Sequence, residues 1–295
     1  MRKDTDNQVK AMTLSILIPT RDCTCYKLVH DLHAQAEQLG ITYEIIVAED
    51  GSRSQVDIIA NHKICELSNC QHILRKENVG RSAIRNFLTA KAKGDALLFM
   101  DADGKVVRHD FLARYLEASK THDVVCGGIK TPDEWHNPQR MLRWKYEKAY
   151  EQKNGRISTQ FRSFCFLVSK RASEQVKFDE RYRDYGYEDV QYGKDLEAAG
   201  FQVHAIDNPL ENTDIETSDI FLEKTEAALR TAHKFQKDIG DSVIISKTYQ
   251  KCRAFRWAIK LLFRLSRKML RRNLLSPNPS LLLFSAYKLG YYSTL

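Results

Sequence analysis

LLFMDADGKV, the segment from Leu97 to Val106, is an apolar run that ends in two aspartates one residue apart. The residues Ala96 to Met100 have the short apolar run of a strand that is covered on both faces. Gly104 suits a tight turn directly after them. We therefore expect Asp101 and Asp103 at the carboxyl end of a central strand, which is the edge where open α/β sheets bind their ligands.

Strands and helices alternate before this segment. LSILIPT (Leu14 to Thr20) and YEIIVAEDGS (Tyr43 to Ser52) are typical of buried strands. YKLVHDLHAQAEQLG (Tyr26 to Gly40) has the pattern of an amphipathic helix that ends at its glycine, and residues 78–94 predict a turn followed by a helix. Three strands with helical crossovers of this length predict an α/β fold with a mostly parallel, Rossmann-like sheet flanked by helices.

A second pair of carboxylates follows the second strand. Glu49 and Asp50 precede a Gly-Ser turn. Since the tips of parallel strands share one edge, we expect these side chains to meet Asp101 and Asp103 in one cleft. A turn in which Glu49 and Asp50 are simply solvated is the open alternative.

A cleft with several carboxylates favours a divalent cation over direct binding of an anion. Mg²⁺ or Mn²⁺ binds carboxylate oxygens on one side and diphosphate oxygens on the other. Asp101 and Asp103 are the predicted metal ligands. Arg21, Arg81 and Arg85 stand at neighbouring strand and helix starts, where they would meet the remaining phosphate charge. Helical arginines are also common as plain surface charges, so this alternative stays open for Arg81 and Arg85.

The charge of the chain is concentrated near its end. The chain has 295 residues with a net charge of +8, and 43% hydrophobic content supports a substantial core. No acidic residue follows Asp241, whereas 11 basic residues do, and the rest of the chain has a net charge of −3. This distribution argues against a nucleic-acid-binding core and for a basic tail with its own partner. The basic residues are Lys247, Lys251, Arg253, Arg256, Lys260, Arg264, Arg267, Lys268, Arg271, Arg272 and Lys288.

Cysteine usage and hydropathy indicate a reduced, cytoplasmic compartment. The seven cysteines are scattered without the paired spacings of a structural zinc site, and we expect most of them to act as small buried groups. Residues 1–10 carry charges of both signs and no apolar core segment, so they predict neither a secretory signal nor an anchor. No stretch reaches the roughly 20 apolar residues that would cross a bilayer. The cysteines are Cys23, Cys25, Cys65, Cys70, Cys126, Cys165 and Cys252.

Four motifs in order, SILIPTRD, VAEDGS, NVGRSAIRN and FMDADG, resemble the nucleotide-sugar-binding half of inverting family 2 glycosyltransferases with the GT-A fold. The resemblance covers about residues 14–104. It implies that Asp101 and Asp103 form the Asp-x-Asp motif that holds the ribose and the metal-bridged diphosphate. It also implies that Asp50 contacts the base of the nucleotide. The same resemblance favours UDP over GDP as the nucleotide of the donor. The implied nucleotide-sugar contacts are Pro19, Thr20, Arg21, Glu49, Asp50, Arg81, Arg85 and Asp101.

One of these residues matches a family motif closely. Arg85 corresponds to the arginine of the Asn-x-Gly-x-x-x-Ala-Arg-Asn helix, and Ile84 replaces the alanine there. This replacement changes packing rather than chemistry.

A Glu-Asp pair in the second half predicts the acceptor site. Glu188 and Asp189 lie in GYEDV, at the start of a helical pattern that runs from Val190 to Gly200. Inverting transfer needs one carboxylate to take the proton of the attacking sugar hydroxyl. The segment resembles the Glu-Asp motif of galactosyltransferase-like enzymes, which implies that Asp189 is the base and that Glu188 binds the acceptor. Favourable first-turn charges at a helix start are the open alternative.

Two departures from the family pattern affect the predicted chemistry. Relatives often carry a histidine, a metal ligand, where this chain has Asn212, so the ligand set beyond the two aspartates is open. The Gln-x-x-Arg-Trp signature of processive synthases is missing, because QRMLRW (Gln139 to Trp144) has the wrong spacing and precedes Glu188. This favours addition of a single sugar. Trp135, Trp144 and Tyr146 would form either an acceptor platform or part of the core.

Two helical segments follow the catalytic part. FLEKTEAALRTAHKFQKDIG (Phe221 to Gly240) predicts a helix packed on the catalytic domain. In the tail, basic residues recur three or four apart and form one helical stripe, with apolar residues opposite. Such a helix lies in the headgroup region of an anionic membrane or packs on the body, and the aromatic LLLFSAYKLGYY segment would be a second interfacial contact. The stripe is Arg253, Arg256, Lys260, Arg264, Arg267 and Arg271, and the opposite side has Phe255, Ala258, Ile259, Leu262, Met269 and Leu270.

The sequence thus predicts three parts: a GT-A catalytic domain over 1–215, a packing helix over 216–245 and a basic amphipathic tail over 246–295. The expected activity is metal-dependent, inverting transfer of one sugar from a nucleotide sugar, with Mn²⁺ or Mg²⁺. The expected acceptor is a glycan or lipid-linked glycan, in cell-surface polysaccharide biosynthesis at the cytoplasmic face of the membrane. FMDADGKV also resembles the first motif of haloacid-dehalogenase-like phosphatases, although Lys105 stands where that family has threonine. A noncatalytic, membrane-docked binding protein is the third hypothesis.

Overall fold

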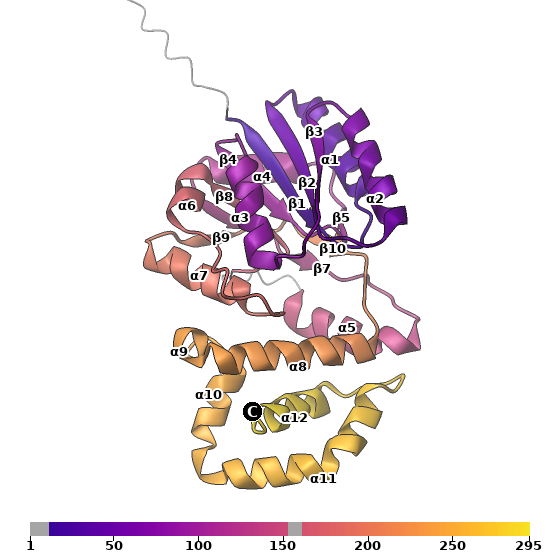
Figure 1. The fold of residues 1–295 in the computed structure, drawn as a ribbon, viewed down its shortest axis with the longest axis vertical. Helices are drawn as coiled ribbons and strands as arrows, with labels where there is room; N and C mark the ends of the chain where they lie inside the picture. Colours follow the sequence, from indigo (N-terminus) through magenta and orange to yellow (C-terminus); the bar gives the residue numbers. More distant parts are fainter. Residues whose placement is uncertain (1–11, 153–160) are drawn as a thin grey trace, which may run out of the picture.

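The computed structural model describes residues 12–152 and 161–295 (Figure 1). The N-terminal segment for which the sequence predicts no leader or anchor lies outside the described residues. The described chain forms an α/β body, with a layer of C-terminal helices packed beneath it in the view of Figure 1.

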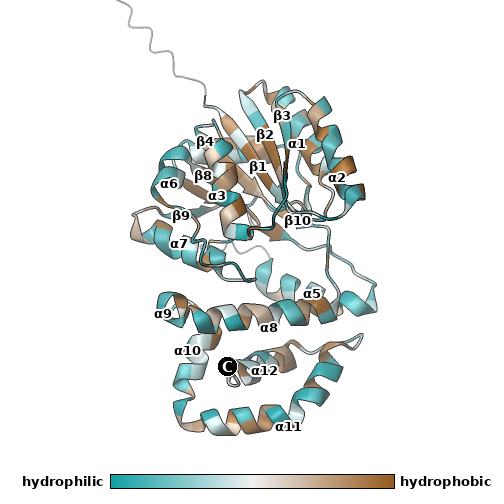
Figure 2. Ribbon diagram, in the orientation of Figure 1, coloured by the Kyte–Doolittle hydropathy of each residue, from teal (hydrophilic) through white to brown (hydrophobic). Residues whose placement is uncertain are grey.

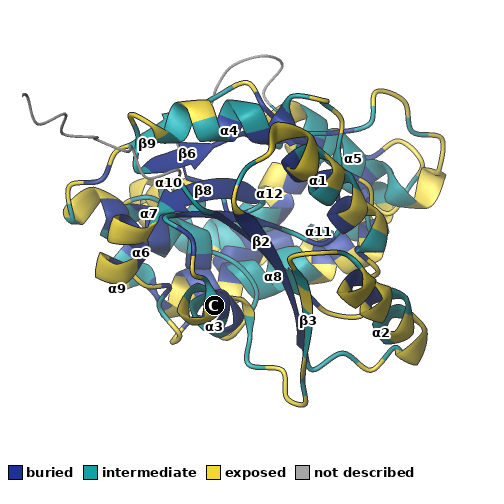
Figure 3. Ribbon diagram, turned by 90° about the horizontal axis from the view of Figure 1, so that it is seen from above, coloured by how far each residue is buried: buried dark blue, intermediate teal, exposed yellow. Residues whose placement is uncertain are grey.

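A mixed sheet forms the centre of the body. Its seven described strands lie in the order β3-β2-β1-β4-β8-β6-β9, and Figure 3 shows the middle of the sheet as buried. The strands β3, β2, β1 and β4 are parallel, β8 is antiparallel to β4 and β6, and β9 is parallel to β6. The bounds are β1 Leu14–Thr20, β2 Tyr43–Asp50, β3 Cys70–Arg75, β4 Ala96–Met100, β6 Val124–Cys126, β8 Cys165–Ser169 and β9 Val203–Ala205.

Helices cover both faces of the sheet because neighbouring strand residues point to opposite sides. In β1, Ile16 packs in the cluster of α1 and α4, whereas Leu17 packs in the cluster of α3, α6 and α7. The mostly parallel α/β fold predicted from the sequence is therefore confirmed. The helix bounds are α1 Tyr26–Leu39, α2 Gln55–His62, α3 Arg81–Lys91, α4 Phe111–Ser119, α6 Lys170–Gln175 and α7 Glu188–Ala198.

The strand at one edge of the sheet was not predicted from the sequence. The β3 strand lies between α2 and α3, at the edge beside β2, so the crossover from β2 to β4 contains a further strand. Its residues are mostly half-buried or exposed, as expected of an edge strand, and so it lacks the apolar run that marks β1, β2 and β4.

A small second sheet extends the carboxyl end of β4. Within the described residues, β5 (Gly104–Val106), β10 (Leu210–Asn212) and β7 (Ile129–Lys130) form it in that order. The backbone N–H and the hydroxyl of Thr213 both donate to the carbonyl oxygen of Asp103, at 3.0 and 2.8 Å. This sheet holds the segment after β4 against the chain that follows the Glu-Asp helix.

The remaining helices build a separate layer with its own hydrophobic core. Tyr182 of the body packs there with Leu142, Leu222, Phe263 and Tyr287 of the layer, so the layer is joined to the body by apolar contacts. Figure 1 shows α8 running beneath the body and α11 at the end of the molecule farthest from the sheet. The bounds are α5 Met141–Tyr146, α8 Ser218–Lys234, α9 Gln236–Ile239, α10 Ile244–Lys251, α11 Arg256–Leu274 and α12 Leu281–Tyr292.

The helical layer shows how the aromatic segment and the basic helix of the tail are packed. Phe284, Tyr287 and Tyr292, in the aromatic segment predicted as an interfacial contact, are buried. In α11, Phe263 and Leu270 are buried as well, so α11 and α12 pack in one core with α8, as in the alternative in which the tail packs on the body. No helix of the described chain combines the length and the apolar character needed to cross a bilayer. All seven cysteines are within the described residues and free, and Cys25, Cys126 and Cys165 are buried.

Candidate active site

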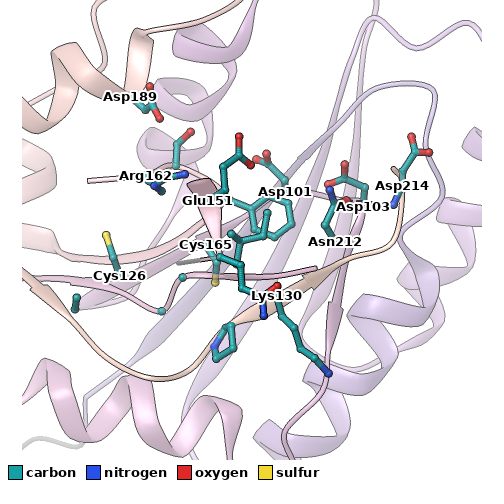
Figure 4. Close-up of a pocket in the computed structure, with 18 of the residues that line it drawn as sticks. Asp101, Asp103, Cys126, Lys130, Glu151, Arg162, Cys165, Asp189, Asn212 and Asp214 are labelled. Carbon is teal, nitrogen blue, oxygen red and sulfur yellow. Dashed lines mark hydrogen bonds between the residues drawn. The ribbon is translucent and has the colours of Figure 1, made fainter. Parts of the chain in front are cut away.

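A cavity of about 400 Å³ opens at the carboxyl end of β4 (Figure 4). Asp101 and Asp103 follow β4, Asp189 belongs to α7, and Arg81 begins α3, so three separate elements bring charged side chains to its wall. In Figure 4, Asp189 lies apart from Asp101 and Asp103 across the drawn site. The structure thus brings together the carboxylates of the two predicted motifs.

The turn after β4 requires a residue without a side chain. Gly104 donates its N–H to the carbonyl oxygen of Asp101 at 3.2 Å. A Cβ atom at this position would lie 2.1 Å from a methyl carbon of Leu210 and 3.2 Å from the Asp101 carbonyl oxygen. The close approach of β10 therefore explains the glycine that follows the two aspartates.

Asp103 is held in an environment that opposes its charge. Burial, followed by repulsion from Asp101, raises the pKa of Asp103 to about 7, although Arg81 acts in the opposite direction. Asp214 adds a further negative charge nearby. A cluster of carboxylates with raised proton affinity is the environment that a bound cation would stabilise.

The donor set fits a hard divalent cation that arrives with a phosphate ligand. Asp101 and Asp103 supply carboxylate oxygens only, which are the ligands that Mg²⁺ and Mn²⁺ prefer. Among the described residues, no group of three or more His, Cys, Asp and Glu side chains is arranged to hold a metal by itself. Mg²⁺ is commonly bound by one or two carboxylates together with substrate phosphates and water, so two aspartates are a sufficient protein contribution.

The position of the histidine expected from relatives has a structural role here. Asn212 is buried and donates a 2.7 Å hydrogen bond to Glu147, while its side-chain oxygen accepts from the N–H of Asp214 at 3.1 Å. His204, the nearest histidine in sequence, stacks on His122 with ring centroids 3.7 Å apart. These contacts occupy both side chains, so Asp101 and Asp103 are left as the predicted metal ligands.

Arg85 connects the two predicted motifs. Its side chain is almost completely buried and donates a 3.0 Å hydrogen bond to Asp101. A second nitrogen lies 3.5 Å from a carboxylate oxygen of Glu188. Arg85 is not part of the cavity wall, so the geometry favours a role in positioning Asp101 and Glu188 over the direct phosphate contact predicted from the sequence.

Glu188 likewise faces the interior of the protein. It is buried, pairs with Arg85, and lies 3.9 Å from Arg81. Because Glu188 is outside the described cavity wall, the structure favours a positioning role for it in place of the predicted contact with the acceptor. Its neighbour Asp189 lines the cavity.

The start of α7 explains how adjacent carboxylates take different directions. Gly186 and Tyr187 both have positive φ angles, 99° and 67°, so the chain turns sharply before the helix. A Cβ atom on Gly186 would lie 2.7 Å from that of Ala228 in α8. Asp189 accepts a 2.8 Å hydrogen bond from the N–H of Val190, a first-turn contact of the kind that stabilises a helix start.

The pKa of Asp189 suits a general base. Burial, followed by repulsion from Glu188, raises it to about 6, whereas Arg162 and Arg85 lower it. A carboxylate of this kind is ionised at neutral pH and has a greater proton affinity than an exposed aspartate. The GYEDV segment predicts this role for Asp189, but it does not predict that Glu188 faces the interior.

Arg81 is the arginine of α3 that reaches the cavity. It is half-exposed, lies over the ring of Tyr185, and faces Glu188 and Asp101. Partial loss of hydration acts to lower the pKa of the guanidinium, but the carboxylates of Glu188 and Asp101 raise it overall, so Arg81 stays charged. Arg81 is therefore available to an anionic group in the cavity.

The predicted residues of β2 have other partners. Glu49 is buried and accepts hydrogen bonds from Asn61 at 2.9 Å and from Ser52, and it contacts His72 at 3.0 Å. Burial raises its pKa, but these contacts lower it overall. Asp50 accepts from the N–H groups of Val79 and Gly80 at 2.9 and 3.1 Å. Both side chains therefore hold the loops around the strand tip, and neither belongs to the described cavity wall.

The predicted nucleotide contacts at the tip of β1 lie beside β2 and β4. Thr20 is buried and donates to the carbonyl oxygen of Cys23 at 2.9 Å, whereas Arg21 is exposed and lies 3.8 Å from Asp22. Pro19 is half-buried. These three residues are not in the described cavity wall, and their nucleotide role stays a prediction.

Several further cavity residues had no signal in the sequence. Arg143 of α5 pairs with Glu151 at 3.0 Å, and Lys224 of α8 pairs with Glu216. These residues come from the helical layer, which becomes a wall of the cavity only through tertiary packing. Among the proposed platform aromatics, Trp144 donates to the carbonyl oxygen of Pro132, and Tyr146 packs against the core of the helical layer.

Comparisons with known proteins identify the family and the fold of the chain. The model of the family described as Glycosyl transferase family 2 matches residues 15–176, more than half of the chain. No curated protein matches the sequence. The match extends from β1 to the end of α6 and so includes Asp101 and Asp103.

Solved structures share the fold at low identity. Mannosyltransferase PcManGT from Pyrobaculum calidifontis, in complex with GDP-Man and Mn²⁺, is 14% identical with a TM-score of 0.53, over 78% of this chain and 66% of that one. This chain thus spans slightly less than two thirds of that protein. Mannosyl-3-phosphoglycerate synthase from Rubrobacter xylanophilus is 14% identical with a TM-score of 0.52, over 76% of this chain and 75% of that one. At this identity the likeness shows the fold alone.

Proposed function

The chain belongs to glycosyl transferase family 2 and has the GT-A fold, and from this premise we propose that it is a metal-dependent, inverting enzyme that transfers a single sugar from a nucleotide-sugar donor. The observation that carries the proposal is one cavity that holds Asp101 and Asp103 together with Asp189. The first two belong to the donor motif and the third to the acceptor motif. The phosphatase alternative is set aside by the family match, since that hypothesis needs a different fold around FMDADG.

The donor half is assigned to Asp101, Asp103 and Arg81. Asp101 and Asp103 would hold Mn²⁺ or Mg²⁺, which neutralises the charge of the leaving diphosphate when bound. Arg81 remains charged in the cavity and orients the phosphates from the side of α3. Arg85 fixes Asp101 from behind.

The acceptor half is assigned to Asp189. Its carboxylate takes the proton of an acceptor hydroxyl as the oxygen of that hydroxyl forms a bond to the anomeric carbon. The bond from that carbon to the diphosphate oxygen breaks, and its electron pair leaves with the nucleoside diphosphate. Attack from the face opposite the leaving group inverts the anomeric configuration. The raised pKa of Asp189 supports this assignment because it places the proton affinity near the working pH.

The proposed donor is a UDP-sugar, on the strength of the motif resemblance. PcManGT was solved with GDP-Man, so GDP-mannose is the alternative that must be tested beside it. The absence of Gln-x-x-Arg-Trp from the sequence supports transfer of one sugar.

The proposed acceptor is a glycan or lipid-linked glycan in cell-surface polysaccharide biosynthesis, and we place the enzyme peripherally at the cytoplasmic face of the membrane. The basic end of the chain supports this location, because 11 positive charges and no negative charge follow Asp241. Free cysteines are consistent with a reduced compartment.

The experiment is the release of nucleoside diphosphate from a panel of UDP- and GDP-sugars, with Mn²⁺, with Mg²⁺ and with EDTA. Slow donor hydrolysis makes the donor visible even without the acceptor. Metal-dependent turnover of one donor supports the proposal and identifies the sugar. The noncatalytic alternative predicts binding of a donor without turnover under every metal condition.

A further inference from the structure

The α11 helix has apolar side chains on two opposite sides. Phe263, Leu270 and Leu274 are buried in the core of the helical layer. On the other side, Trp257 and Leu265 are 71% and 76% exposed. A soluble surface helix needs only the first of these apolar sides, so the second requires a separate explanation.

The exposed apolar residues form one row along the helix. Trp257, Leu261, Leu265 and Met269 follow one another at intervals of four residues, and each is exposed. Leu262, which is also exposed, widens the row. Figure 2 shows the alternation of brown and teal along α11, and in Figure 1 none of the labelled elements lies beyond this helix on the side away from the body.

A basic row runs beside the apolar one. Lys260, Arg264, Lys268 and Arg272 also follow at intervals of four residues, each three residues after a member of the apolar row. Within the described part of the chain, none of these four residues forms an ion pair. Other basic residues of α11 behave differently, since Arg267 and Arg271 lie 3.5 and 3.8 Å from Glu226 of α8.

The orientation found here differs from the one predicted from the sequence. The predicted basic stripe contained Arg267 and Arg271, which point toward α8, and the predicted apolar side contained Leu270, which is buried. The outward side instead combines one apolar and one basic row. We call the eight residues of these rows the docking face: Trp257, Lys260, Leu261, Arg264, Leu265, Lys268, Met269 and Arg272.

We propose that the docking face binds a bilayer that contains anionic lipids, with α11 parallel to the membrane plane. The apolar row enters the boundary between headgroups and acyl chains, and the basic row meets the lipid phosphates. Trp257 stands beside the basic row, at the depth where tryptophan is favoured in membranes. This inference deepens the membrane location proposed above and does not depend on sugar transfer.

Charge decides between the possible occupants. A second copy of the chain would bring one basic row close to another, without an acidic residue after Asp241 to offset the repulsion. An anionic bilayer offers both the negative surface and the apolar interior that the two rows require.

The docking face is firmly connected to the cavity. Glu226 of α8 accepts a hydrogen bond from the hydroxyl of Tyr287 at 2.5 Å and faces Arg267 and Arg271 of α11. Lys224, two residues before it, lines the cavity. A bilayer bound at α11 therefore has a fixed position relative to the active site, which suits an acceptor that is held in the same membrane.

The first measurement uses the fluorescence of Trp257. The chain has three tryptophans, and Trp135→Phe with Trp144→Phe leaves Trp257 as the sole reporter. Vesicles of phosphatidylcholine with phosphatidylglycerol should shift its emission to shorter wavelength, whereas vesicles of phosphatidylcholine alone should shift it much less. An unchanged spectrum with the anionic vesicles overturns the proposal.

The second measurement is co-flotation of the full chain with the same vesicles. Leu265→Glu should weaken vesicle binding by about tenfold or more, because it puts a charge where the wild type inserts an apolar side chain into the bilayer. Val56→Glu is the matched control, since Val56 is 79% exposed on α2 of the body and should bind like the wild type. Deletion of 251–295 is a poor test because it removes part of the core of the helical layer.

The outcomes separate this inference from the proposed function. Leu265→Glu and the wild type should unfold at the same temperature, which shows that the variant is folded, and they should hydrolyse the donor at the same rate in solution. Equal binding of Leu265→Glu and Val56→Glu contradicts the docking face. A concentration-dependent dimer that Leu265→Glu abolishes, without vesicle binding by the wild type, assigns the face to a second copy instead.

Discussion

Asp101 and Glu188 are joined by the buried guanidinium of Arg85. One nitrogen of Arg85 donates to Asp101 at 3.0 Å, and another lies 3.5 Å from Glu188. Asp101 belongs to the donor motif, and Glu188 precedes the residue that we assign as base. A single buried side chain therefore sets the position of one motif relative to the other.

Replacement of Arg85 tests this connection. Arg85→Met should lower the free energy of unfolding by about 3 kcal/mol, because it leaves the buried Glu188 and the partly buried Asp101 without the cation between them. Urea denaturation measures the change. Arg171→Met is the control, since it breaks an exposed pair with Asp123, and exposed pairs contribute little to stability. Equal losses of unfolding free energy in the two variants would contradict a larger contribution from the buried contact.

Asp189→Asn should separate donor binding from transfer. The amide cannot accept the proton of the acceptor hydroxyl, so we expect the transfer rate to fall by about 10²–10⁴-fold while the affinity for the donor is kept. Initial rates and calorimetric titration with the nucleoside diphosphate measure the two quantities. Asp195→Asn, on the same helix but outside the described cavity wall, should retain the wild-type rate. Full activity in Asp189→Asn would assign the base elsewhere.

The rate of transfer should fall at acidic pH. Burial and the charge of Glu188 raise the pKa of Asp189 to about 6, and the base acts only when it is ionised. We therefore expect kcat/KM to decrease about tenfold for each pH unit below about 6, and to be level above it. A profile that stays level well below that pH would show that Asp189 does not act as the base.

Removing the negative charge of Asp103 should stabilise the protein. The pKa of Asp103 is raised in the folded state by burial and by Asp101, so its ionisation opposes folding as the pH rises through about 7. Without metal, Asp103→Asn should therefore raise the Tm at neutral pH. Asp110→Asn should instead lower the Tm, because a hydrogen bond from Arg114 lowers the pKa of Asp110 in the folded state. Thermal unfolding in EDTA compares the two variants.

The same two variants test the metal. Binding of the nucleoside diphosphate should require Mn²⁺ or Mg²⁺, because Asp101 and Asp103 repel the phosphates in the absence of a cation. Asp103→Asn should weaken metal-dependent binding by more than about tenfold, and Asp110→Asn should not. Calorimetry with and without EDTA provides the measurement. Tight binding of the nucleoside diphosphate in EDTA would show that binding does not need the metal.

The central part of the fold could be predicted because its residues are fully buried. β1 and β4 begin and end as predicted, since runs such as Ala96 to Met100 have no polar residue to blur their limits. β3 was missed because an edge strand mixes polar and apolar residues. The reversed direction of β8 leaves no trace in its local sequence, because direction is set by the tertiary path of the chain.

The sequence predicted which carboxylates share a cavity, but it predicted their surroundings only in part. Asp101, Asp103 and Asp189 line the cavity, as their motifs indicate. The motifs do not reveal that Arg85 and Glu188 face one another inside the protein, since this depends on how α3 and α7 pack. The two apolar sides of α11 were equally hidden, because a helical wheel does not say which side a neighbour covers.

The most direct test of the account is metal-dependent release of nucleoside diphosphate from one nucleotide sugar, compared between the wild type, Asp103→Asn and Asp110→Asn. We predict turnover of one donor by the wild type and by Asp110→Asn, with Mn²⁺ or Mg²⁺ only, and strong loss in Asp103→Asn. If no donor is bound or turned over with any metal, or if Asp103→Asn turns over as fast as the wild type, the proposed sugar transfer at this site is contradicted.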